Sequence, residues 1–324
     1  MTYEQTPQGH PIAHPFATPD KPRSTWENRP TGAANDSAAA RSTTSSARAR
    51  SVRRVRDVDQ IIERLSQRDL AILRSVAEHQ FLTVPQVEAL HFSDHAETSG
   101  PRIARRTLAR LRDLRVLGTL DRHIGGLGAG SEGLVHYVDT VGQQVLTGRP
   151  GRNVRRFHEP SRRFLRHRLA IADARLSLLK AHRAELIELV DSTVEPGAWR
   201  HYVGLGGARL TPKPDLYAET ASPPGSDMVH AWFVEIDLGT ESITTLLRKC
   251  RAYESYRQSG VEQTRSGGFP LVVWSVSHTD EKRGKSRRAA FLDAIAHDRS
   301  LTAELFRVVR PDELVPTLLG GGQS

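Results

Sequence analysis

Two carboxylates at the end of one strand are the first sign of chemistry in this sequence. The segment "HAWFVEID", residues 230–237, is largely apolar and ends in Glu235 and Asp237, which one isoleucine separates. Because side chains alternate between the two faces of a strand, both acids must leave the same face. Such a pair either binds a divalent cation, which prefers oxygen ligands, or caps the next helix and pairs with Arg or Lys. In the second interpretation Asp237 or Thr240 is the cap.

A further acid, Asp215, follows Pro214 and stands directly before the β-prone run "LYA". The turn-rich segment "TASPPGSDM" separates this run from residues 230–237, so the two strands are expected to form an antiparallel hairpin. Asp215 begins the first strand and Glu235 lies near the end of the second. We therefore expect these two carboxylates to lie close together.

Helical patterns flank the hairpin. Residues 161–186 predict a helix with Asp173 at the edge of its buried arc, and that arc consists of Phe164, Leu165, Leu169, Ala172, Leu176 and Leu179. Residues 240–258 predict a second helix, in which Lys249 borders the apolar arc beside Tyr253 and Tyr256. A buried strand (269–277), a helix (285–298) and a short final strand within 305–314 follow. This order predicts an α/β domain.

The preceding residues predict three helices and a hairpin. Residues 65–80 carry an apolar helical period with Ser66 as N-cap, and residues 81–92 have Thr83 as cap with Pro85 in the first turn. The third helix lies within 101–118. Two β-prone runs then surround a Gly-rich tip within 119–140, and a short helix is expected over 141–146. Three helices followed by a hairpin is the order of a winged helix-turn-helix.

One face of the third helix carries positive charges only. Its arginines are Arg102, Arg105, Arg106, Arg110 and Arg112. Its one acid is Asp113, whereas a solvated face usually mixes signs. A basic face on the third helix suits phosphate and major-groove contacts, so we expect it to bind double-stranded DNA. The alternative is a winged helix used for protein pairing. The tip "GGLGAGSEG" either follows a DNA groove or backbone or is simply a flexible loop.

Composition favours an anionic partner. The 324 residues include 46 Lys+Arg and 37 Asp+Glu, which gives a net charge of +9. An arginine-rich bias of composition is the alternative, and the clustering of the arginines argues against it. No run of eighteen apolar residues and no signal-peptide core is found, so we expect a cytoplasmic protein without membrane contact. Cys250 is the one cysteine, which excludes an internal disulfide and a Cys-rich zinc site.

These patterns divide the chain into five predicted parts. Residues 1–56 are rich in Pro, Ser, Thr, Ala and Arg and are expected to be a disordered basic tail, either adding phosphate contacts or serving only as a solvated extension. The other parts are a winged helix-turn-helix (57–148), a basic linker (149–160), an α/β domain (161–315) and a flexible C-terminal tail (316–324).

The element order of the second half resembles the PD-(D/E)XK nuclease superfamily. The resemblance implies that Asp215, the acid of "PD", and Glu235 bind Mg²⁺ or Mn²⁺. It implies that Asp173 supplies the acid that some members place in the preceding helix. The usual lysine position, two residues after Glu235, is occupied by Asp237, either a second ligand or a positioning group. In some members the lysine has moved to the next helix, where Lys249 is the candidate that would help the attacking water.

Residues 66–310 are similar to the replication-relaxation proteins of actinobacterial plasmids and integrative elements. The resemblance rests on long segments, among them "RDLAILRSVAEHQFLTVPQVEALHF", "ARRTLARLRDLRVL", the "GGLGAGSEGLVHYVD" hairpin, "HRLAIADARL", "KPDLY" and "FVEIDLGTESITTLLRKCRAY". It implies a DNA-binding protein of plasmid replication or transfer and does not supply a defined reaction.

Three functions follow from these observations. The first is a metal-dependent DNA endonuclease or nickase, and the second is a non-catalytic DNA-binding initiator or transcriptional regulator that retains a nuclease fold. The third, a relaxase with a tyrosine nucleophile, is disfavoured because no His-hydrophobic-His triplet occurs; His167, six residues before Asp173, is the histidine of most interest. A homodimer on two half-sites and partners from the replication or transfer machinery are further expectations.

Overall fold

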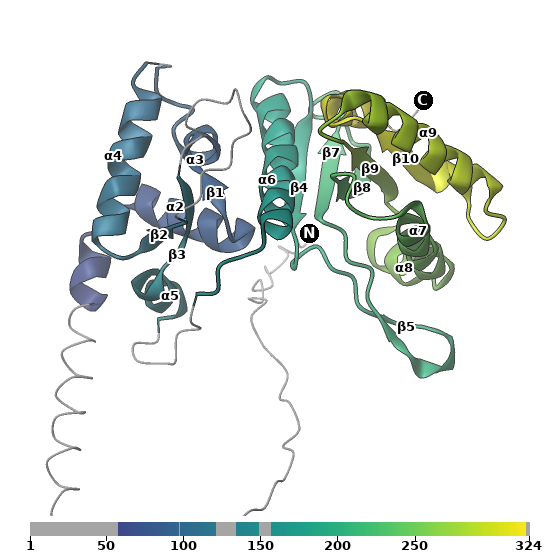
Figure 1. Ribbon diagram of the computed structural model, residues 1–324, viewed down its shortest axis with the longest axis horizontal. Helices are drawn as coiled ribbons and strands as arrows, with labels where there is room; N and C mark the ends of the chain where they lie inside the picture. The colour runs from purple at the N-terminus through teal and green to yellow at the C-terminus, as the bar shows by residue number, and fades with distance from the viewer. Residues whose placement is uncertain (1–57, 97, 121–133, 149–156, 322–324) are drawn as a thin grey trace, which may run out of the picture. The chain divides into compact units, whose positions relative to one another are not determined.

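The computed structural model describes residues 58–96, 98–120, 134–148 and 157–321 (Figure 1). The predicted tail (1–56), the hairpin tip "GGLGAGSEG" and most of the predicted linker (149–160) lie outside these residues. All of the described residues belong to one compact unit, residues 49–324. The domain boundaries drawn from the sequence remain predictions.

The N-terminal half contains the predicted three helices and hairpin. Its elements are α2 (Gln67–His79), β1 (Leu82–Thr83), α3 (Val84–His91), α4 (Gly100–Asp113), β2 (Leu117–Thr119), β3 (Val135–Val138) and α5 (Thr140–Thr147). The strands form a three-stranded antiparallel sheet in the order β1-β3-β2. The side chains of Ser66 and Thr83 cap α2 and α3 as predicted, each within a reciprocal capping box, and Pro85 lies in the first turn of α3.

The long helix α6 (Arg162–Arg183) packs against both halves of the molecule, and more than one of its sides is buried. Ile171 and Leu178 pack in the core of the C-terminal half, whereas Ala172 packs in the core of the N-terminal half. One residue of the predicted buried arc is corrected: Phe164 is exposed. It lies in the first turn of the helix, where its ring meets the edge of the Phe81 ring.

The C-terminal half is built on a five-stranded mixed sheet. Its strands are β4 (Glu188–Val194), β7 (Leu216–Ala221), β8 (Val229–Asp237), β9 (Leu271–Val276) and β10 (Phe306–Val309), in the order β10-β9-β8-β7-β4. The predicted hairpin is confirmed, because β7 and β8 pair antiparallel. Strand β4 was not predicted and pairs antiparallel with β7, while β8, β9 and β10 run parallel.

Helices cover both faces of this sheet. Trp232 and Val234 of β8 pack with residues of α6 and of α10 (Leu314–Leu319), and Phe233 packs with residues of α7 (Ile243–Gln258) and α9 (Glu281–His297). Helix α10 crosses the boundary predicted at residue 315, and its Leu318 is fully buried. The remaining elements are β5 (Tyr202–Val203), η1 (Leu205–Gly207), β6 (Arg209–Leu210), α8 (Val261–Ser266), η2 (Ala303–Leu305) and η3 (Pro311–Glu313). In the part of the chain that the structure describes, no helix has the length and apolarity needed to cross a membrane.

Candidate functional site

Three carboxylates occupy equivalent positions on three neighbouring strands. The register pairs Val194 with Leu216 and Leu216 with Val234, so the next position on each strand holds Glu195, Asp215 and Glu235. The backbone N–H of Glu195 donates to the carbonyl of Asp215 at 3.0 Å, which continues the pairing past the end of β4. The sheet therefore gathers acids that lie far apart in the sequence into one row.

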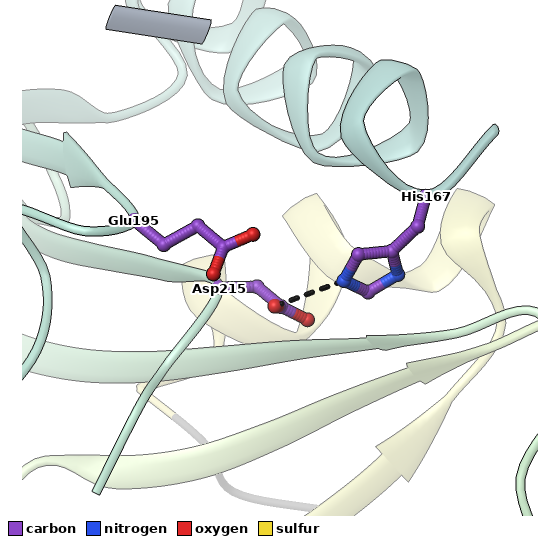
Figure 2. A group of neighbouring side chains, drawn as sticks. All are labelled: His167, Glu195 and Asp215. Atoms are coloured by element: carbon purple, nitrogen blue, oxygen red, sulfur yellow. Dashed lines mark hydrogen bonds and ion pairs between the residues drawn. The ribbon is translucent and has the colours of Figure 1, made fainter. Parts of the chain in front are cut away.

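Asp215 is the centre of this row. It is 4% exposed, and its Oδ2 accepts a hydrogen bond of 2.7 Å from the backbone N–H of Ile236. Its Oδ1 lies 3.0 Å from Nε2 of His167, which projects from α6 (Figure 2). Burial opposes the charged form of His167, but the hydrogen bond and charge of Asp215 outweigh it and raise the pKa of the imidazole. Asp215 thus favours the protonated form of His167.

His167, Glu195 and Asp215 form the group best suited to a metal ion. One ligand atom from each of the three lies within 4.8 Å of the others, and Figure 2 shows the side chains converging from α6, from the end of β4 and from the start of β7. Two carboxylates and an imidazole are ligands for divalent cations. Among the described residues, this is the one such group of three or more His, Cys, Asp or Glu side chains.

Glu195 is held in place by a buried arginine. Arg168 is 1% exposed, and its Nη1 donates to Glu195 Oε1 at 2.5 Å. The same guanidinium donates to the backbone carbonyls of Glu78 and His79 at the end of α2, at 3.3 and 3.2 Å. A carboxylate has two oxygens, so this ion pair still leaves one oxygen of Glu195 for a cation. One side chain therefore links the N-terminal half to a candidate ligand.

Glu235 is buried beside this group. Its Oε1 accepts a hydrogen bond of 2.6 Å from the hydroxyl of Tyr253, and its Oε2 lies 3.4 Å from Nζ of Lys249. Burial and then the charge of Asp215 raise the pKa of Glu235 from an ordinary 4.5 to about 8. The sheet thus places this carboxyl where a negative charge is costly.

Lys249 reaches the row from α7. Its Nζ lies between Glu235 and Glu241, at 3.4 and 3.3 Å, and its side chain is 38% exposed. Burial works against its charge, but the neighbouring carboxylates of Glu235, Asp215 and Glu241 prevail and raise the pKa of Lys249 above its ordinary value. Lys249 therefore stays protonated at neutral pH.

Asp237 and Asp173 lie in other contacts. Asp237 forms an ion pair with Arg287 of α9 at 2.5 Å. Asp173 is exposed and accepts a hydrogen bond of 2.7 Å from Gln86 of α3. The expected cap of α7 is corrected, because Ser242 caps that helix instead of Asp237 or Thr240. Of the predicted site residues, the structure brings Asp215, Glu235 and Lys249 together but places Asp173 and Asp237 elsewhere.

The basic helix is α4, and its arginines differ in their surroundings. Arg102, Arg105 and Arg106 are exposed, and Arg112 is half-buried. Arg110 is exposed too, but it donates at 2.5 Å to Asp69, the buried acid of the capping box of α2. The free basic face therefore consists mainly of the first three arginines.

Two residues of the site, Glu195 and Arg168, were not predicted. Glu195 ends the strand pattern "ELVDSTV" and precedes a proline, so it is a strand-end acid like Asp215 and Glu235. That repetition was the signal available in the sequence. Arg168 stands within a segment rich in arginines, and nothing in that segment distinguishes a buried arginine from solvated ones. The tyrosines of α7, Tyr253 and Tyr256, are buried, and their hydroxyls donate to Glu235 and Glu262.

Comparison with known proteins gives one match. The sequence model of a family described as replication-relaxation matches residues 73–272, which is more than half of the chain and spans α2 to the start of β9. No curated protein and no solved structure matches the chain.

Proposed function

Because the chain belongs to the replication-relaxation family, we propose that it binds double-stranded DNA during replication or transfer of a plasmid or mobile element, and that it cuts DNA as a metal-dependent endonuclease or nickase. The observation that carries the proposal is the group of His167, Glu195 and Asp215 beside the Glu235–Lys249 pair. The family match links the chain to replication, and the site supplies the chemistry.

The N-terminal half supports DNA binding. Helices α2, α3 and α4 followed by the antiparallel pair β2–β3 have the order of a winged helix-turn-helix, in which α4 would be the recognition helix. Its exposed arginines, Arg102, Arg105 and Arg106, would contact phosphates or base edges. Arg110, which is tied to Asp69, would instead fix α4 against α2.

The topology of the C-terminal half supports a nuclease-like domain. The order α6, β4, β7, β8, α7, β9 fits the PD-(D/E)XK resemblance, with three antiparallel strands followed by a helix and a parallel strand. Asp215 and Glu235 then fall on the adjacent strands where the motif expects its two acids. Lys249 approaches Glu235 from the following helix, which is consistent with a relocated lysine.

The donor atoms fit a divalent cation. Asp215, Glu195 and His167 would hold it, and Glu235 on the next strand would be a further ligand or would position the attacking water. The carboxylates suit Mg²⁺ or Mn²⁺ equally, but the imidazole makes Mn²⁺ the better fit. Such a cation polarises a phosphoryl oxygen and lowers the pKa of water.

The side chains around the cation site would balance its charge and hold or donate protons. Lys249 has a pKa above its ordinary value, so it would act as a charged hydrogen-bond donor to the water or to a phosphate oxygen and not as a base. The pKa of Glu235 is raised by burial and by the charge of Asp215, so its carboxyl takes up a proton more readily than an ordinary glutamate and would release it on becoming a ligand. Tyr253 already donates to Oε1 of Glu235 and would stabilise the ionised form.

A non-catalytic DNA-binding initiator or transcriptional regulator is the second candidate. It is favoured by Asp237 at the usual lysine position and by Arg168, whose ion pair already neutralises Glu195. In that case the same fold would bind DNA and the acids would serve structure alone.

A plasmid-nicking assay tests the proposal. Supercoiled plasmid is incubated with the full chain and Mn²⁺, Mg²⁺ or chelator, and the variants are Asp215→Asn, Glu235→Gln and, as a matched control, Asp173→Asn. We expect Mn²⁺-dependent conversion to open circles, lost by at least about a hundredfold in the first two variants, since even outer-shell changes at metal sites cost 10–100-fold. The Asp173→Asn chain should cut normally because Asp173 contacts Gln86 outside the site.

Two results would contradict this function. Cutting that persists in Asp215→Asn would show that the activity does not come from this site. No cutting by the unaltered chain in any metal, with duplex binding retained, would favour the non-catalytic initiator or regulator.

A further inference from the structure

A short two-stranded arm separates two of the candidate ligands. Residues 196–214 leave the sheet after Glu195 and return to it at Asp215, and within them β5 and β6 pair antiparallel with Val203 opposite Arg209. In Figure 1 this hairpin projects away from the sheet. The arm is thus an extension of the loop that joins the site's own strands.

The base of the arm is firmly anchored. The hydroxyl of Tyr202 donates to Ser255 Oγ at 2.9 Å, and its ring packs 4.9 Å from the ring of Tyr256. The buried guanidinium of Arg200 lies 3.3 Å from Glu262. The arm is therefore held at a fixed position relative to α7 and α8.

The outer part of the arm exposes apolar side chains. Val203 is 64% exposed and Leu210 is 39% exposed. The turn between them depends on glycine: Gly206 and Gly207 have φ values of 80° and 79°, and a Cβ on Gly204 would lie 2.7 Å from Leu210 Cδ1. Anchored apolar residues on a narrow ribbon resemble a contact surface more than a core.

The charge of the arm has one sign. Residues 196–214 contain three Arg and Lys residues and no Asp or Glu. Arg200 is paired with Glu262, whereas Arg209 and Lys213 are exposed, and the ammonium of Lys213 lies 4.6 Å from the centre of the Trp199 ring. A basic segment that also presents apolar side chains is complementary to a nucleic-acid duplex, with phosphates for the cations and groove edges for the apolar groups.

We propose that the arm, residues 196–214, is a second duplex-DNA contact of this protein, separate from α4. Val203 and Arg209 are register partners, so they share one face of the ribbon. Val203 presses against sugar or base edges in a groove, and Arg209 and Lys213 contact the flanking phosphates. The inference rests on the proposed function, because it makes DNA the ligand of the C-terminal half. Val203 follows Glu195 by only eight residues, so it lies at most about 29 Å from this ligand, less than one turn of duplex at about 34 Å. The arm would therefore touch the duplex within one turn of the cut.

Site-directed photocrosslinking tests the arm. The one native cysteine, Cys250, is fully buried, so Val203→Cys provides a single accessible thiol for a photoactivatable azidophenacyl group. Met228→Cys is the matched control: Met228 is 65% exposed against 64% for Val203, and it precedes β8 at the end opposite Glu235. Each labelled full-length chain is irradiated with a mixed-sequence duplex at low salt. We expect crosslinks from position 203 in several-fold excess over position 228.

A salt titration with Arg209→Ala provides an independent readout. Loss of one phosphate contact should reduce the slope of log affinity against log salt by about 0.9. The proposed role of the arm is overturned if the duplex still binds, the salt slope is unchanged, and positions 203 and 228 crosslink equally. That result leaves the proposed function intact. Crosslinking from position 203 without plasmid nicking overturns the nuclease activity and retains the arm. Absence of all duplex binding overturns both.

Discussion

The two halves of the molecule place their charges in opposite ways. In the N-terminal half the cations of α4 are exposed, while histidines such as His79 and His136 are buried. Burial, followed by the charge of nearby arginines, lowers the pKa of these two histidines to about 3 and about 4. In the C-terminal half the carboxylates Asp215 and Glu235 are buried, and the pKa of Glu235 is raised to about 8.

This difference indicates that the functional residues of the two halves affect folding stability to different extents. A surface that attracts phosphates through exposed arginines needs no buried charge, so it can be changed with little effect on folding. A site that gathers carboxylates in a sheet must desolvate them, which destabilises the fold unless a partner compensates. Arg168 and Lys249 are the partners in this structure. Three predictions test this comparison, from the largest expected effect to the smallest.

Removal of Arg168 should have the largest effect on stability. Arg168→Ala leaves Glu195 and two backbone carbonyls of α2 without their buried donor, so the free energy of unfolding should fall by about 3–5 kcal/mol. Arg106→Ala, at an exposed position of α4, should change it by no more than about 0.5 kcal/mol. Urea unfolding followed by the fluorescence of the buried Trp232 and Trp274 measures both. Equal effects of the two substitutions would contradict the role assigned to Arg168.

The stability of the two halves should respond to pH in opposite directions. The folded His136 has a pKa of about 4 against an ordinary 6.5, so it contributes stability that is lost as pH falls from 6.5 to about 4. His136→Leu should reduce this loss of unfolding free energy by roughly 3 kcal/mol. Folded Glu235 has a raised pKa, so the unfolding free energy falls as pH rises from 4.5 to about 8. Glu235→Gln should remove that decline.

Urea unfolding at a series of pH values separates these effects, because each variant is judged by its slope and not by its absolute stability. An unaltered slope between pH 4 and 6.5 in His136→Leu would show that this histidine is not the titrating group. A melting temperature of Glu235→Gln at neutral pH that exceeds that of the unaltered chain would confirm that the site lowers stability, and a lower one would contradict it.

Loss of the basic face should affect DNA binding and leave folding unchanged. Replacing Arg102, Arg105 and Arg106 together by alanine should reduce the salt slope of duplex binding by about 2.7 if each contacts one phosphate. The melting temperature should stay constant because all three are exposed. The matched control replaces Lys282, Arg283 and Lys285, three exposed cations of α9. Equal changes in slope for the two triple variants would show that DNA is attracted to the basic protein in general and not to the face of α4.

Local signals in the sequence predicted much of the fold. The caps at Ser66 and Thr83, the β7–β8 hairpin and the amphipathic α4 each depend on short-range chemistry. Strand β4 was missed because its pattern "ELVDSTV" mixes acids with β-branched residues and leaves Val190 and Asp191 exposed. As an edge strand, it has only one neighbour, β7.

The candidate site could be predicted only in part for the same reason. Asp215 and Glu235 belong to one hairpin, so their proximity follows from local pairing. His167 and Glu195 join them only through the packing of α6 and the pairing of β4 with β7, both of which are long-range. Asp173 resembled a ligand because it lies in the helix before the strands. Six residues along a helix rotate a side chain by about 240°, so Asp173 and His167 cannot share a face.

The adjacency of His167 and Arg168 on α6 limits how such proteins can be recombined. One of these neighbours faces Asp215, and the other contacts both Glu195 and the end of α2. A chimaera that takes its N-terminal half from one relative and its C-terminal half from another, joined before α6, would pair an α2 terminus and an arginine that did not evolve together. Chimaeras between relatives should therefore take the last turn of α2 and the whole of α6 from the same parent.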